Sequence, residues 1–116
     1  MSDTERYHRR FSTLDEVKQA NASIGHHWFD RDTLRFFSSR FSETLHGGRF
    51  FVSSERPPHG PRAYTVREAL SDGSVETRGE FMAYANRRQA QEAAAELART
   101  EPLGMSRREW CEMANA

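Results

Sequence analysis

Two arginines at the start of a predicted helix are the best candidates in this sequence for binding an anion. Asn86 has the form of an N-cap and Gln89 stands at the capping-box position, so Arg87 and Arg88 fall in the first helical turn. Two cations there oppose the helix dipole, at a cost of roughly 0.3–1 kcal/mol each. An anion held by these side chains and the free backbone N–H groups would offset that cost. Glu92, four residues after Arg88, offers a simpler compensation.

Charged residues on a predicted β-hairpin are a second set of candidate contacts. Asp72-Gly73 lies between two runs of strand-forming residues, which is a strong hairpin signal. If these two residues form the loop, Val66 faces Gly79, and side chains alternate between two faces. The core face then carries mainly apolar residues: Tyr64, Val66, Leu70, Val75 and Phe81. The exposed face carries polar residues: Thr65, Arg67, Glu76, Arg78 and Glu80.

The exposed face of this hairpin allows two interpretations. In the first, its charges are solvated and pair across the strands, as Arg67 can with Glu76 or Glu80. In the second, the face contacts a protein partner through Arg67, Arg78 and Glu80. The sequence leaves both interpretations open.

Signals for catalysis and metal binding are weak along the chain. His26 and His27 are adjacent and point in different directions, whereas a zinc site needs three or four suitably spaced ligands. No GxSxG elbow, Walker-type loop or dinucleotide-binding glycine loop is present. Cys111 is the single cysteine, so neither an internal disulfide nor a thiolate cluster can form. We therefore expect no enzyme activity, no cofactor and no metal.

Charge and hydropathy bound the class of protein. Lysine and arginine number 17 and aspartate and glutamate 17, a balance that argues against a surface attracting nucleic acid everywhere. Lys18 is the only lysine, and arginine suits bidentate recognition of carboxylate or phosphate. The chain has no apolar run long enough for a membrane span and no secretory signal, so we expect a cytoplasmic protein.

Helix-start signals place two helices in the first third of the chain. Thr13 and Glu16 have the capping-box spacing, which predicts a helix over about Leu14–Ala22. Asp30 is a suitable N-cap for a second helix over about Arg31–Arg40.

Strand signals are followed by helix signals in the rest of the chain. A strand is expected over Arg49–Ser54, followed by a proline-rich loop and the hairpin. The helix after Asn86 presents mainly small residues on one face: Ala90, Ala93, Ala94, Leu97 and Ala98. Another capping box at Ser106 opens a short last helix.

The order helix-helix-strand-strand-strand-helix-helix predicts a single α+β domain, with a three-stranded antiparallel meander packed on helices that cover one face. Residues 1–11 are expected to form a polar basic arm, residues 12–101 the α+β domain, and residues 102–116 a short C-terminal helix packed on it or extending it. The strands followed by an alanine-rich helix with a basic start resemble, in outline, a double-stranded-RNA-binding domain. The usual glycine-rich approach and lysines are replaced by Tyr84-Ala85-Asn86 and arginines.

Several short strings, taken together, resemble a small uncharacterised family of bacteriophages and plasmids of GC-rich bacteria, over about Phe11–Ala98. The strings are GHHWF (25–29), RFFSSR (35–40), GGRFFVSSE (47–55), YTVREA (64–69), DGSV (72–75) and GEF (79–81). The resemblance implies an accessory factor and transfers no catalytic or binding residue.

The function expected from these observations is that of a non-enzymatic binding protein of a phage or other mobile element. It would occupy the surface of a host protein or ribonucleoprotein, for example as an anti-CRISPR or antirestriction inhibitor of a defence complex. The alternative is a nucleic-acid-binding module that uses Arg87 and Arg88. No membrane partner is expected.

Overall fold

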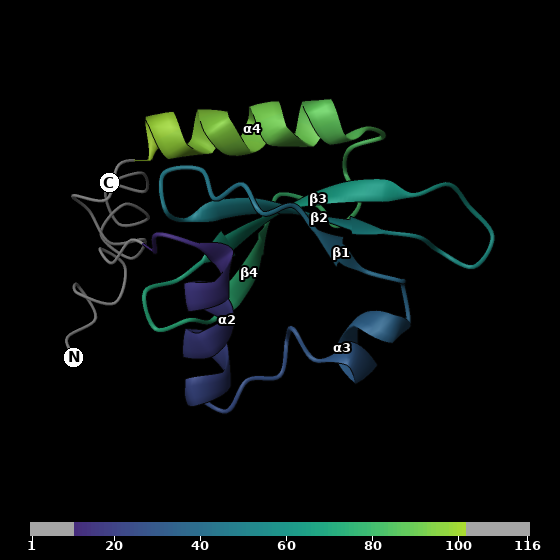
Figure 1. Cartoon of the computed structure of the whole chain (residues 1–116). Helices are drawn as coiled ribbons and strands as arrows, with labels where there is room; N and C mark the ends of the chain where they lie inside the picture. The colour runs from purple at the N-terminus through teal and green to yellow at the C-terminus, as the bar shows by residue number, and fades with distance from the viewer. Residues whose placement is uncertain (1–10, 102–116) are drawn as a thin grey trace, which may run out of the picture.

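Residues 11–101, the part of the chain that the computed structural model describes, form an α+β domain in which two helices are followed by four strands and then by another helix (Figure 1). The helices are α2 (Leu14–Ser23), α3 (Arg31–Arg35) and α4 (Arg87–Thr100). The strands are β1 (Arg40–Phe41), β2 (Phe50–Glu55), β3 (Ala63–Ala69) and β4 (Val75–Arg78). The predicted fold class is confirmed. Residues 1–10 of the predicted arm and the predicted last helix lie outside the described residues, whereas Phe11, assigned to the arm, is buried in the core.

The sheet is antiparallel, in the order β1-β2-β3-β4, so each strand pairs with its neighbour in the sequence. Strands β2, β3 and β4 are the predicted meander. Strand β1 is an addition: Arg40 pairs with Ser54 and Phe41 with Ser53. Two residues are too few to show an alternating pattern, which explains why the sequence did not indicate this strand.

The register predicted for the hairpin is wrong by one residue. Val66 pairs with Arg78 rather than Gly79, and the loop has three residues, 71–73, with Gly73 in the left-handed region at φ +98°. A three-residue hairpin loop with a left-handed glycine is a common alternative to the two-residue loop. Because side chains alternate, this shift moves the side chains of β4 to the opposite face.

Helices cover both faces of the sheet, so the expectation of one covered face is also wrong (Figure 1). On one face Phe51 and Ala69 pack against three residues before and within α2: Phe11, Leu14 and Val17. On the other face Phe50, Val52 and Val66 pack against Ala90 and Ala94 of α4. The consecutive apolar residues of β2 are therefore buried on alternate sides.

The predicted starts of α2 and α4 are confirmed. The Thr13 hydroxyl accepts a hydrogen bond from the Glu16 backbone N–H at 3.3 Å, and the Asn86 side chain accepts one from Gln89 N–H at 2.9 Å. The alanine face of α4 allows close approach, since a Cβ added at Gly47 would lie 2.9 Å from the Ala98 Cβ. Local signals thus placed the two helices that build the core.

Helix α3 is shorter than predicted and ends at Arg35 instead of Arg40. The Asp30 side chain makes no capping hydrogen bond. Beyond the helix, Ser38 is left-handed at φ +48°, and the Phe37 carbonyl accepts a hydrogen bond from Arg56 N–H at 2.7 Å. This tertiary contact draws the chain out of the helix and into β1.

Candidate binding surface

Two of the predicted contact residues, Arg67 and Arg78, lie on opposite faces of the sheet, where Arg67 is buried and Arg78 is half-buried. The Arg67 Nη2 lies 2.8 Å from Glu55 Oε1, and its Nε donates to the Ser53 hydroxyl at 2.9 Å. Glu55 is 1% exposed, so this ion pair belongs to the core. The prediction that Arg67 and Arg78 lie on one exposed face is wrong because the sheet is covered on both sides and the register differs.

Arg78 belongs to a network on the α4 face, which we call the buried salt-bridge network; it consists of Arg49, Glu68, Arg78 and Glu101. Arg78 lies 2.9 Å from Glu68 Oε1 through Nη1 and 2.6 Å from Glu101 Oε2 through Nη2. Arg49 contacts the second oxygen of Glu68, which is fully buried. Every charge in the network has an opposite charge beside it, as burial requires.

The carboxylates around Arg78 also govern its protonation. Burial of the guanidinium acts to lower the pKa of Arg78. The hydrogen bonds and negative charges of Glu101 and Glu68 outweigh burial, and the net effect is a raised pKa. Arg78 is thus a permanent cation that holds the end of α4 to the sheet.

The remaining predicted contacts, Arg87, Arg88 and Glu80, are exposed but lie apart from the buried arginines. Arg88 lies 3.1 Å from Glu92 Oε1, the simple compensation expected from their spacing. Arg87 makes no ion pair within residues 11–101 and lines a hollow with Arg40 and Tyr64. The structure therefore separates the two arginines that the sequence grouped together.

A group of neighbouring rings, which we call the exposed aromatic cluster, consists of the exposed Phe36 and Phe81 with the half-buried Phe37 in contact with both. The Phe36 and Phe37 ring centroids are 4.7 Å apart, and those of Phe37 and Phe81 are 5.3 Å apart. Phe36 is 74% exposed and Phe81 42%. Sequence reasoning missed this cluster because it placed Phe36 and Phe37 within a longer helix and Phe81 in the core.

The residues that directly follow Phe37 and Phe81 have a left-handed backbone conformation. Within the described residues, Ser38 and Met82 are the only non-glycine residues with positive φ, at +48° and +57°. Each directly follows a ring of the cluster. The Ser38 carbonyl accepts from Arg62 at 3.0 Å, and Met82 N–H donates to the Thr65 hydroxyl at 2.9 Å. A left-handed non-glycine residue costs roughly 1–2 kcal/mol, and such strain concentrates at functional sites.

Arg67 connects the exposed aromatic cluster to the core. Its guanidinium carbon lies 5.3 Å from the Phe81 ring centroid and 5.1 Å from that of Trp28. The cation is held by Glu55 at one end and by aromatic faces at the other. Arg67 is therefore buried behind Phe81, and 8% of it is exposed.

The arginines divide sharply by partner. Eleven lie in the described residues, and those with a carboxylate partner are Arg49, Arg67, Arg78, Arg88 and Arg99. The others have none within those residues, and together we call them the unpaired arginines: Arg31, Arg35, Arg40, Arg56, Arg62 and Arg87. They come from α3, β1, the β2–β3 loop and the start of α4, which lie at one end of the domain (Figure 1).

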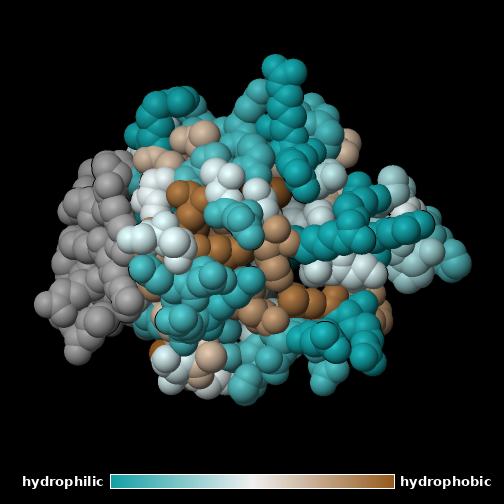
Figure 2. Space-filling model, in the orientation of Figure 1, coloured by the Kyte–Doolittle hydropathy of each residue, from teal (hydrophilic) through white to brown (hydrophobic). Residues whose placement is uncertain are grey.

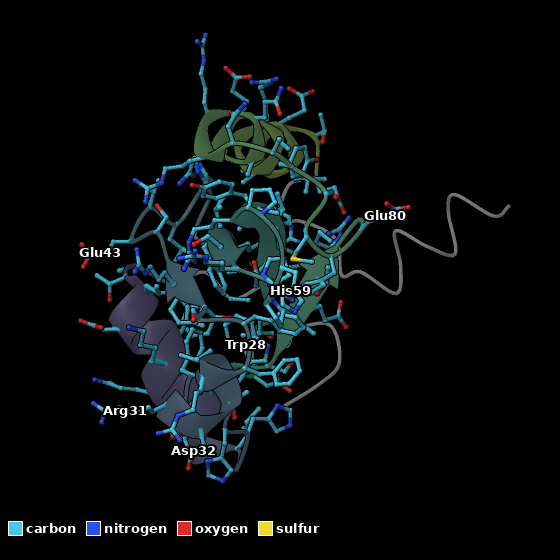
Figure 3. All side chains as sticks on the ribbon, turned by 90° about the vertical axis from the view of Figure 1, so that its right-hand side faces the viewer. Trp28, Arg31, Asp32, Glu43, His59 and Glu80 are labelled. Atoms are coloured by element: carbon cyan, nitrogen blue, oxygen red, sulfur yellow. The ribbon has the colours of Figure 1, made fainter. Side chains whose placement is uncertain are left out.

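The surface at this end combines charge with apolar atoms. In Figure 2, hydrophilic side chains project on the right around a strip of brown hydrophobic atoms. Figure 3 looks onto this end: Arg31 and Asp32 lie close together at the bottom, and Glu43 and Glu80 project at opposite sides. The carboxylates labelled there thus lie around the edge of this surface.

The described residues lack a grouped metal site and a helix that could span a membrane. Within residues 11–101 no three histidine, cysteine or acidic side chains are grouped so that they could hold a metal ion. No helix in that part of the chain is long and apolar enough to span a membrane. The surface described above is the feature that distinguishes this domain.

A family model described as a family of unknown function, DUF7447, matches residues 13–95. The chain belongs to the DUF7447 family. The match covers nearly the same residues as the predicted resemblance to a small uncharacterised family, and it includes the exposed aromatic cluster and all the unpaired arginines. Neither a curated protein nor a solved structure matches the chain. The phage origin and the likeness to double-stranded-RNA-binding domains stay predictions.

Proposed function

We propose that this DUF7447 protein is a non-enzymatic binding protein that docks on another protein through the exposed aromatic cluster. The observation that carries the proposal is the exposure of Phe36, at 74%, on a chain segment followed by strained backbone. A phenylalanine fully buried against a partner contributes about 1.5–3 kcal/mol. Backbone that costs stability yet holds rings in water is explained when a partner covers those rings.

The surroundings of the cluster have the composition of a protein interface. Aromatic residues and arginine are enriched at the centre of such interfaces, and a polar rim surrounds them. Phe36, Phe37 and Phe81 supply the centre, and the unpaired arginines supply charge around it. Arg67 and Trp28 behind Phe81 hold that ring in place, which lowers the entropy lost on binding.

A protein partner is favoured over free nucleic acid by the carboxylates near the rings. Glu80 immediately precedes Phe81, and Asp32 lies four residues before Phe36. A base stacked on either ring would bring its phosphate near one of these negative charges. Arg88, one of the two expected phosphate contacts, is paired with Glu92. Binding to nucleic acid through Arg87 and Arg88 remains the alternative that the experiment below addresses.

The identity of the partner is a more specific part of the proposal. The resemblance to proteins of mobile elements suggests a host complex in the bacterial cytoplasm, and inhibition of a defence complex of the CRISPR or restriction type is its most specific form. This part depends on that resemblance alone. The docking surface is argued from the geometry and stands independently of it.

The proposal is tested by affinity capture from a bacterial lysate, with and without nuclease, read by mass spectrometry. The wild type is compared with Phe36→Ser and with the matched control Ile24→Ser, which removes an exposed apolar side chain, 40% exposed, elsewhere on the domain. We expect a protein that survives nuclease and is lost with Phe36→Ser but retained with Ile24→Ser. Equal retention by both variants, or recovery of nucleic acid alone, would contradict the proposal.

A further inference from the structure

A hollow between α3 and β1 combines cations with an apolar floor. The arginines that line it are Arg31, Arg35 and Arg40, and its apolar lining comes from Phe29 and Leu34. None of the three arginines has a carboxylate partner within the described residues. A negatively charged group with an apolar neighbour matches this lining better than a uniformly charged one does.

A second hollow is lined by residues of β1, β2, β3 and the start of α4. Arg40 and Arg87 line it together with the Tyr64 side chain and the nearly buried Ser54. The Ser54 hydroxyl accepts a hydrogen bond from Arg62 at 2.8 Å, which adds a third guanidinium beside the hollow. Guanidinium groups bind carboxylates through paired N–H donors, so the arginines beside this hollow suit a carboxylate at the surface. The hollow itself, about 20 Å³, has room only for a water-sized group.

Arg40 belongs to both hollows, so the two adjoin across β1, the edge strand of the sheet. The nearby carboxylates do not pair with the arginines of the two hollows within the described residues. Asp32 is exposed beside Arg31 (Figure 3), and Glu43 lines a different hollow together with Lys18 of α2. The result is a continuous row of unpaired cations from α3 over β1 to α4.

We infer that this row, Arg31, Arg35, Arg40 and Arg87, binds an acidic segment of the protein partner, with apolar side chains of that segment over Phe29 and Leu34. The inference rests on the proposed function, because it names the chemistry of the partner at the same end of the domain. Charge complementarity supports it: these guanidinium groups have no carboxylate partner within residues 11–101 and can pair with carboxylates of the segment. The apolar floor favours a peptide over a nucleic-acid backbone.

The test uses fluorescence anisotropy with a fluorescein-labelled decaglutamate peptide at low salt, and a ten-nucleotide oligothymidylate of similar length as the competing probe. We expect decaglutamate to bind more tightly than oligothymidylate. Loss of one exposed ion-pairing arginine corresponds to about a fivefold loss of affinity, and we expect this for Arg40→Gln and for Arg87→Gln.

Matched controls are Arg88→Gln and Arg99→Gln, which remove arginines of α4 that already pair with Glu92 and Glu96. These variants should stay within about twofold of the wild type. An equal loss in both pairs of variants, tighter binding of oligothymidylate, or no decaglutamate binding at millimolar protein overturns the inference.

The lysate capture separates the failure of this inference from failure of the proposed function. If Phe36→Ser loses the partner while an Arg40→Gln/Arg87→Gln double variant retains it, the docking surface stands and the acidic segment is wrong. If Phe36→Ser retains the partner, the proposed function is wrong whatever decaglutamate does. Circular dichroism of each variant confirms that the fold is kept.

Discussion

The buried salt-bridge network and the arginine-rich end of the domain use the same residue types in opposite ways. In the network, Arg49 and Arg78 sit on either side of Glu68, and each cation is satisfied within the fold. At the other end, Arg40 and Arg87 have no carboxylate partner within the described residues and line open hollows. The pairing of an arginine, and not its place in a motif, thus separates the arginines that stabilise the fold from those that we propose bind a partner.

The largest expected effect comes from breaking the network at its centre. Glu68→Ala leaves the Arg49 and Arg78 charges inside the domain without their shared partner, and removing one member of a buried pair costs about 3–5 kcal/mol. Urea denaturation measures the loss in free energy of unfolding. Glu92→Ala, which breaks the exposed pair with Arg88, is the control and should cost at most about 0.5 kcal/mol. Similar losses for both would show that burial does not distinguish the two pairs.

A smaller loss is expected where α2 meets the hairpin loop. The buried Asn21 side chain donates to the Gly73 carbonyl at 2.8 Å and accepts from Trp28 N–H at 3.2 Å. Asn21→Ala leaves both backbone groups without this partner and should cost about 1–3 kcal/mol in denaturant unfolding. The exposed Gln19→Ala on the same helix should be near neutral. A neutral Asn21→Ala would mean that this contact does not hold the loop.

At the exposed aromatic cluster, a substitution should stabilise the domain. Ser38→Gly relieves a left-handed non-glycine residue and should raise the free energy of unfolding by up to about 1 kcal/mol. Ser39→Gly, at a position without positive φ, should lower it slightly, because glycine loses more entropy on folding. Thermal unfolding of both variants checks the signs. If Ser38→Gly destabilised the domain, the left-handed conformation of Ser38 would not be a source of strain.

The smallest effect concerns pH. Because the pKa of Arg78 is raised in the fold, its contribution is complete below the pKa of the unfolded state and is lost only above the still higher folded value. The stability difference between wild type and Arg78→Gln should therefore be the same at about pH 7 and about pH 9. Denaturant unfolding at both values measures it. A difference that shrinks towards pH 9 would contradict the raised pKa.

Much of the fold could be predicted because its signals are local. Thr13 and Asn86 cap helices through side chains that reach only three residues along the chain, and Ala90 and Ala94 mark a buried face by their spacing. The hairpin at Gly73 was placed correctly for the same reason. The exposure of the candidate contacts was predicted less well, since Arg67 is buried and Arg78 half-buried, while the sequence did not single out Phe36 or Arg40.

Burial and pairing were decided only when distant segments met. The loop at Gly73 packs against α2, where an added Cβ would lie 2.6 Å from the Ala20 Cβ, and this contact lies more than fifty residues away along the chain. The hairpin has a three-residue loop here, and the resulting register places the Arg78 side chain on the face of the sheet that α4 covers. The sequence by itself determined where helices and strands begin, because caps and periodicity are short-range. Tertiary structure decided which face of the sheet each charge occupies, because a shift of one residue in the register moves every side chain of a strand to the opposite face.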